Sequence, residues 1–128
     1  AGCIFLGNTT YQQYLNDLYP VKGVTNIVLT KNSSLKSEHA NVAYASSPED
    51  AVKKAEASGN DEAILIGGGI TNGSFLKEGL INEVVLSIHP LVLGDGIHLF
   101  EGCKSGPKLD LVKEKKIGDL VQIHYKVS

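Results

Sequence analysis

The sequence predicts an α/β fold: a mostly parallel sheet flanked by helices and followed by a C-terminal antiparallel hairpin. Two patterns support this prediction. Strand-like apolar runs alternate with helix-like segments over most of the chain, which is typical of parallel strands joined through helices. Two alternating segments then end the chain with a short Gly-Asp turn between them, which indicates a hairpin. With 128 residues, 42% of them hydrophobic, the chain can form one domain with one core.

Hydrophobic spacing and turn residues give the order of the predicted elements. Strands are expected at residues 3–6, 26–30, 42–45, 63–66, 83–93, 109–116 and 120–127. Helices are expected after residues 8–10 and through Leu18, at 48–58 and after residue 69. For the first helix, Asn8 and the two following threonines offer capping side chains. For the second, Ser47 is the expected cap and Pro48 the first helical residue.

A glycine-rich turn joins the strand at 63–66 to the helix that follows it. Residues 63–76 read AILIGGGITNGSFL, so three glycines stand where the strand ends. Without Cβ atoms, the backbone N–H groups of the helix start can approach a phosphate closely. The order matches neither the G-x-G-x-x-G dinucleotide motif nor a P-loop. Taken alone, the turn is equally compatible with an anion site and with a tight connection that binds nothing.

Other strand ends favour the anion site. Ligands of open parallel sheets bind at the carboxyl ends of the strands. Gly7, Thr30, Ser46 and Gly67 all fall at such ends. Because these ends meet at one edge of a parallel sheet, the four residues are expected to lie near one another.

Composition excludes several other classes of protein. The net charge is −2 and the pI is near 6.1, which gives no basic surface for nucleic acid. No apolar run reaches transmembrane length and no segment resembles a signal peptide, so we expect no membrane partner and a cytoplasmic location. Cys3 and Cys103 are far apart in the sequence, which favours free thiols over a disulfide. The four histidines lack the spacing of metal ligands, so no metal site is expected.

The order of the motifs resembles the dihydrofolate reductase superfamily, including its RibD C-terminal branch. Five segments carry the resemblance, in the order of the family, at residues 4–11, 26–30, 64–69, 79–83 and 89–96. The resemblance implies a single dihydrofolate-reductase-like domain over residues 1–128, with three layers and a mixed, mostly parallel central sheet. It also implies an NADPH-dependent reductase that transfers a hydride to a pterin- or pyrimidine-like heterocycle, and a homodimer.

The resemblance also implies which residues bind the cofactor. Gly7 and Thr10 match the Gly-Arg-x-Thr cofactor turn of the family. Thr30 and Lys31 match polar residues that face the adenosine 2′-phosphate, and Ser46 approaches the adenosine. The full implied set is Gly7, Asn8, Thr9, Thr10, Thr30, Lys31, Ser46, Gly67, Gly68, Gly69, Ile70, Thr71 and Asn72. The family joins the Gly67–Gly68 pair by a cis peptide, and the next four residues cover the pyrophosphate.

Several residues depart from the family pattern. Asn8 stands where the family commonly has Arg, so recognition of the 2′-phosphate depends more on Lys31. Ile66 stands where pyrimidine reductases of the riboflavin pathway carry a substrate-binding Glu, and Val24 lies near the position of a folate-binding Arg. These residues therefore point to neither substrate. Ser87 is the one candidate for the substrate pocket, and a structural hydrogen bond to backbone is an equal alternative.

No residue of this chain matches the first strand of the family and the loop after it, which carry the substrate-binding acid. The catalytic residue is therefore unknown. We expect the functional molecule to have an additional N-terminal segment, either preceding Ala1 in the same polypeptide or supplied by another chain, that fills the middle of the sheet. Two function classes stay open: a reductase, and a nucleotide-binding domain of this fold without catalytic activity. Lys31 and the threonines also have simpler interpretations, as a solvated lysine and as helix caps.

Overall fold

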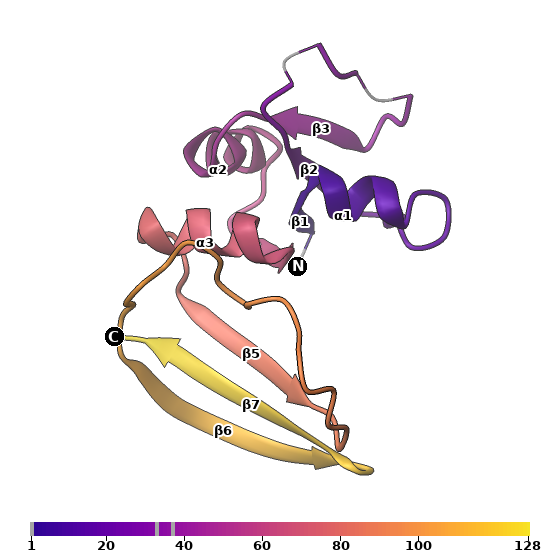
Figure 1. Ribbon diagram of the computed structural model, residues 1–128. Helices are drawn as coiled ribbons and strands as arrows, with labels where there is room; N and C mark the ends of the chain where they lie inside the picture. Colours follow the sequence, from indigo (N-terminus) through magenta and orange to yellow (C-terminus); the bar gives the residue numbers. More distant parts are fainter. Residues whose placement is uncertain (1, 33, 37) are drawn as a thin grey trace.

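The computed structural model describes residues 2–32, 34–36 and 38–128, and Figure 1 shows their arrangement. The elements in chain order are β1 (Cys3–Gly7), α1 (Asn8–Gln13), β2 (Thr25–Leu29), β3 (Val42–Ala45), α2 (Pro48–Ala57), β4 (Ile64–Gly67), α3 (Gly69–Lys77), β5 (Glu83–Ile88), β6 (Leu109–Ile117) and β7 (Leu120–Val127). The predicted α/β class and the alternation of strands with helices are confirmed.

The first sheet is entirely parallel and has the order β3-β2-β1-β4. In its middle, Phe5 of β1 is paired with Ile27 of β2 on one side and Leu65 of β4 on the other. All four strands point the same way, so their carboxyl ends lie along one edge. The turns that follow β1 and β4 lead directly into α1 and α3.

Helices cover both faces of this sheet. On one face, Ala51 of α2 and Phe75 of α3 pack against side chains such as Phe5, and the two phenylalanine rings stack with centroids 5.3 Å apart. On the other face, Tyr11 of α1 packs with Leu6. Alternate residues of β1 enter the two cores, and all five residues of this strand are buried, as expected for a central parallel strand.

The second sheet is antiparallel, has the order β5-β7-β6, and contains the predicted C-terminal hairpin. Ile117 pairs with Leu120 across the tight turn. Figure 1 shows this sheet apart from the ribbons of β1, β2 and β3. In the described part of the chain, no strand pairing joins the two sheets. A cleft of about 1,410 Å³ is lined by β4 from the first sheet and β5 from the second.

The first helix is shorter than predicted, because it ends at Gln13 and not at Leu18. The N–H groups of Leu18 and Tyr19 both donate to the carbonyl of Tyr14, and Asn16 takes a positive φ of 71°. Asn tolerates this left-handed conformation, so a turn replaces the last helical residues. The predicted capping by Asn8 is also wrong, because Gly7 is the N-cap and Asn8 is the first helical residue.

The strand predicted at 83–93 ends at Ile88. Pro90 has no backbone N–H to give to a ladder, and the N–H of Leu91 donates to the carbonyl of His89 in a turn. The apolar side chains after this point are therefore exposed: Val92 retains 99% of its accessible surface and Ile97 retains 86%. Within the described residues, no helix combines the length and the apolar character that crossing a bilayer requires.

Candidate functional site

Two glycine turns meet at the carboxyl edge of the parallel sheet. The turn after β1 is formed by Gly7 and the start of α1, and the turn after β4 is formed by Gly67, Gly68 and the start of α3. A Cβ atom on Gly7 would lie 2.5 Å from Thr71 Oγ1, and one on Gly68 would lie 3.5 Å from Thr10 Oγ1. The two turns are therefore in contact, as the sequence predicted for residues at adjacent strand ends.

The second turn has the backbone that the resemblance implies. The Gly67–Gly68 peptide is cis, and Gly67 has a φ of 131°, which residues with a Cβ atom rarely adopt. Gly68 is the N-cap of α3 and provides no side-chain cap. The first backbone bond of the helix runs from the Asn72 N–H to the Gly68 carbonyl over 2.9 Å. The N–H groups of residues 69–71 precede it and have no intrahelical acceptor, which suits a bound anion.

Asn72 lies directly behind this turn and is only 8% exposed. Its Nδ2 donates to the carbonyl of Leu99 over 3.0 Å. Its Oδ1 is buried and, in the described chain, accepts no hydrogen bond. Both atoms lie within 4 Å of the position that a Cβ on Gly67 would take. A buried acceptor without a donor costs about 1–3 kcal/mol, so Asn72 Oδ1 is open to a donor from an ordered water or a bound ligand.

A second group of predicted residues lies at the ends of β2 and β3. The N–H of Thr30 donates to the carbonyl of Ala45 over 2.9 Å, which holds the two strand ends side by side. Thr30 Oγ1 accepts from the N–H of Asn32, so this hydroxyl stabilises the turn that begins there. Lys31 is exposed in this turn, and Ser46 is exposed at the end of β3.

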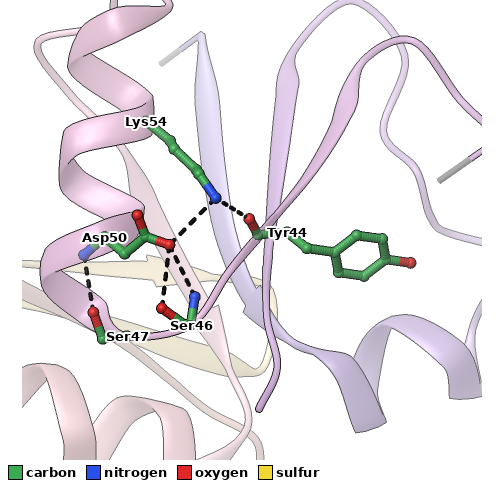
Figure 2. Close-up of polar contacts among 5 residues, drawn as sticks. All are labelled: Tyr44, Ser46, Ser47, Asp50 and Lys54. Atoms are coloured by element: carbon green, nitrogen blue, oxygen red, sulfur yellow. Dashed lines mark hydrogen bonds and ion pairs between the residues drawn. The ribbon is translucent and has the colours of Figure 1, made fainter. Parts of the chain in front are cut away.

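Asp50, on the first turn of α2, holds Ser46 in place through hydrogen bonds (Figure 2). Its Oδ2 accepts from the Ser46 N–H over 3.0 Å and from Ser46 Oγ over 3.4 Å. Lys54 Nζ lies 3.2 Å from the same oxygen and also donates to the carbonyl of Tyr44. The predicted N-cap is confirmed, because Ser47 Oγ accepts from the Asp50 N–H over 3.0 Å. The end of β3 is thus held by a charged network.

These contacts predict a pH dependence of stability. The Ser46 N–H, followed by Lys54, holds the pKa of the Asp50 carboxyl below its usual value. As the pH falls, the Asp50 carboxyl is therefore protonated in the unfolded state before it is protonated in the folded state. Its contribution to the free energy of unfolding is present above about pH 4 and is lost as the pH falls through the folded pKa. We expect Asp50→Asn to be less stable than the natural chain at pH 7, with the difference shrinking at pH 2–3. Urea unfolding across this range measures it, and a pH-independent difference would contradict the assignment.

The structure places the other predicted residues as follows. Asn8 and Thr9 open α1, where Asn8 Oδ1 accepts from Gln12 Nε2 over 3.3 Å and the Thr9 side chain is exposed. Ile70 is 76% exposed on the first turn of α3. Ser87 is exposed on β5, in the other sheet, and does not join the glycine turns.

One role of the glycines was missed at the level of sequence. Gly69 and Gly73 lie four residues apart on α3, and the segment 98–103 crosses the helix over them. A Cβ on Gly69 would lie 2.3 Å from the His98 carbonyl oxygen, and one on Gly73 would lie 2.0 Å from that of Glu101. Gly69 therefore allows close packing of backbone as well as a turn. The Gly-x-x-x-Gly spacing was the signal that could have indicated this contact.

The described residues give little support for a metal site or a reactive cysteine. Among the described residues, no group of three or more His, Cys, Asp or Glu side chains is placed to hold a metal ion. Both cysteines are free. Cys3 is fully buried, and burial raises the pKa of its thiol, which disfavours the reactive thiolate.

Comparisons with known proteins agree with this architecture. The model of the RibD C-terminal domain family matches residues 15–123. The chain is 30% identical over 125 residues to the uncharacterized protein YwjB of Bacillus subtilis (strain 168), covering 95% of this chain and 71% of YwjB.

Two solved structures share the fold. A protein from Shewanella sp. PV-4, whose description refers to riboflavin biosynthesis, superposes with a TM-score of 0.79 and 25% identity, over 99% of this chain and 74% of that one. A diaminohydroxyphosphoribosylaminopyrimidine deaminase/5-amino-6-(5-phosphoribosylamino)uracil reductase from Thermotoga maritima superposes with a TM-score of 0.76 and 15% identity, over 99% of this chain and 45% of that one. The chain belongs to the RibD C-terminal domain family.

Proposed function

We propose that this chain binds NADPH as part of a reductase that transfers a hydride to a C=N or C=O group of a pterin- or pyrimidine-like heterocycle. The observation that carries the proposal is the contact between the two glycine turns at the carboxyl edge of the parallel sheet. Family membership and the likeness to the reductase-containing protein from Thermotoga maritima support it.

The residues of the two turns suit a dinucleotide. The N–H groups at the start of α3 bind the pyrophosphate, and Gly67 and Gly68 leave room for it to approach the backbone. Thr10 and Thr71 present hydroxyl groups where the turns touch. Lys31 binds the 2′-phosphate, with Ser46 beside the adenosine. The nicotinamide supplies the hydride when bound, and the protein orients it and excludes water.

The direct test is a thermal shift of the intact protein. A ligand that binds only the native state stabilises it by about 2.7 kcal/mol at a concentration one hundred times its dissociation constant. We expect NADPH to raise the melting temperature, with a smaller effect of NADH at the same concentration. Absence of a shift with either dinucleotide at millimolar concentration would end the proposal.

Lys31→Ala tests which group reads the 2′-phosphate. Since Asn8 replaces the usual Arg of the family pattern, Lys31 is the cation expected there. A hydrogen bond between charged groups is worth about 1.5–3 kcal/mol, so we expect a loss of roughly ten- to a hundredfold in NADPH affinity. NADH affinity should stay within a factor of two. Calorimetric titration measures both constants.

Lys22→Ala is the matched control for this variant. Lys22 is also exposed, but it precedes β2 and so lies at the opposite, amino end of the strand. It should change neither affinity. Equal losses of NADPH and NADH binding in Lys31→Ala would show that Lys31 does not recognise the 2′-phosphate.

A nucleotide-binding domain without activity is the second candidate, because no residue of this chain matches the substrate-binding acid of the family. A shift with NADPH but no oxidation of NADPH by the intact protein would favour this candidate.

We also propose a homodimer, in which the exposed apolar residues Leu91, Val92 and Leu93 are covered. Sedimentation as a monomer at micromolar concentration would count against the dimer.

A further inference from the structure

The antiparallel sheet has one apolar face and one polar face. Residues that pair directly across its strands share a face, and successive residues along a strand alternate between the two faces. By this register, apolar side chains from all three strands lie together on one face. Away from α3, that face consists of Leu86, Ile88, Leu111, Val121 and Ile123, and we call these five residues the open apolar face.

Only the end of this face next to α3 is covered. Val84 is 9% exposed and lines a cavity of about 240 Å³ together with Leu76 of α3. Further along the strands, Ile88 is 53% exposed, Val121 38% and Leu111 60%. An apolar sheet face is stable when a second layer packs on it, so the open apolar face requires a partner.

The exposed apolar surface continues beyond the end of β5. Ile88 pairs with Val121, which places the end of β5 beside the turn between β6 and β7 (Figure 1). Leu91, Val92 and Leu93 follow directly, and Val92 retains 99% of its accessible surface. Monomeric proteins rarely expose large contiguous apolar patches, so this end of the molecule is suited to contact with protein.

The partner approaches the face of the sheet and not its edge. In the described chain β6 pairs only with β7, so its outer side is open. The strand has a register shift between Leu111 and Lys113, and it also carries lysines at positions 115 and 116. Bulges and lysines are common devices that prevent pairing between edge strands. Pairing of β6 with a strand of another molecule is therefore disfavoured.

Two opposite charges border the open apolar face. Glu114 pairs with Ile123 and Lys116 pairs with Val121, so both charged side chains lie on this face of β6. Both residues are exposed. They are separated by one residue, which points to the polar face. The border of the face therefore carries one charge of each sign at neighbouring levels of the same strand.

This arrangement is self-complementary. In a twofold interface, a contact between one residue and another occurs twice, once in each direction. A twofold axis perpendicular to the strands, midway between the levels of Glu114 and Lys116, brings each of these residues to the other one in the second copy. The same axis sets apolar residues against each other, Leu86 against Ile88 and Ile123 against Val121.

We propose that the open apolar face packs on the same face of a second copy of this chain, with Glu114 of each copy beside Lys116 of the other. Two sheets packed in this way lie about 10 Å apart, with the apolar side chains between them. This interface rests on the homodimer proposed for this chain and does not depend on NADPH binding.

Charge reversal, followed by sedimentation equilibrium of the intact protein, tests the interface. Glu114→Lys sets two lysines against each other in the dimer, and Lys116→Glu sets two glutamates against each other. We expect each change to weaken the dimer about tenfold or more, because attraction becomes repulsion at two symmetric contacts. The double variant Glu114→Lys/Lys116→Glu restores opposite charges, so its dissociation constant should return to within about threefold of the natural value.

Lys113→Glu is the matched control for Lys116→Glu. It makes the same change of net charge on the same strand, but Lys113 pairs with His124 and lies on the polar face. We expect it to change the dissociation constant less than about threefold. An equal loss in Lys113→Glu and Lys116→Glu would show that net charge controls the association and would overturn the proposal.

The remaining outcomes separate this interface from the homodimer itself. A dimer that none of the reversals at Glu114 and Lys116 weakens would overturn the interface and leave the homodimer standing. A double variant as weak as the single variants would overturn the reciprocal pairing of the two charges. A monomer at every concentration would leave the open apolar face to a different partner and overturn both proposals, whereas the thermal shift with NADPH would be unaffected.

Discussion

Gly73→Ala is expected to lower the free energy of unfolding by about 2 kcal/mol. The added Cβ would meet the backbone carbonyl oxygen of Glu101 at 2.0 Å, so the segment above α3 must move as a whole. Its displacement would break the bond from the Glu101 N–H to the Gly69 carbonyl and the bond from Asn72 to Leu99. The greater helix propensity of Ala recovers about 1 kcal/mol at most, which is less than the cost of crowding and lost hydrogen bonds.

Gly96→Ala is the matched control for this measurement. A Cβ on Gly96 would have no heavy atom within 4 Å, and the backbone there does not require glycine. Urea unfolding should therefore place Gly96→Ala within about 0.5 kcal/mol of the natural chain. If Gly73→Ala also stayed within this range, the result would contradict the close packing of the segment 98–103 on α3.

Local pattern was sufficient to predict most elements of the fold. The residues of β3 and β7, the cap and first residue of α2, and the strand–glycine–helix sequence at β4 all follow from short-range chemistry. The end of α1 could not be predicted in this way. Tyr14 and Leu18 have helical spacing, but the turn at Asn16 takes the carbonyl of Tyr14 as its acceptor and ends the helix earlier.

Pairing between distant strands was harder to predict. The residues of β4 do not show which strands it pairs with, because its apolar composition suits the middle of a sheet and the structure places it at an edge. The resemblance to a family predicted a missing central strand, and the separation of the two sheets is compatible with this expectation. It stays a prediction.

For the candidate site, the sequence predicted which strand ends converge but not which atoms touch. Gly7 and Gly67 were expected together because both end parallel strands, and the structure places their turns in contact. The contact of Thr71 with Gly7 depends on how α3 is rotated about its axis, which the segment 98–103 helps to fix through Gly69 and Gly73. Sequence spacing carries no information on that rotation.

Gly7→Ala is expected to weaken NADPH binding at least about tenfold, because it fills the point where the two turns meet. The new Cβ would lie 2.5 Å from Thr71 Oγ1 and 3.7 Å from Thr71 Cβ. The hydroxyl must therefore rotate away, and we expect a loss of stability of about 1–2 kcal/mol. Unfolding by urea and calorimetric titration with NADPH measure the two effects separately.

The double variant Gly7→Ala/Thr71→Ala separates packing from ligand binding. Removing the Thr71 hydroxyl leaves contacts of 3.6 Å to the Gly67 carbonyl oxygen and 3.7 Å to Thr71 Cβ, which are ordinary van der Waals distances. Stability should therefore return to that of Thr71→Ala alone, a coupling expected only for side chains in contact. NADPH affinity should stay low, because the ligand still meets a methyl group and has lost a hydroxyl partner. Recovery of both stability and affinity in the double variant would show that Gly7 serves the packing of the turns and that the dinucleotide does not approach its backbone.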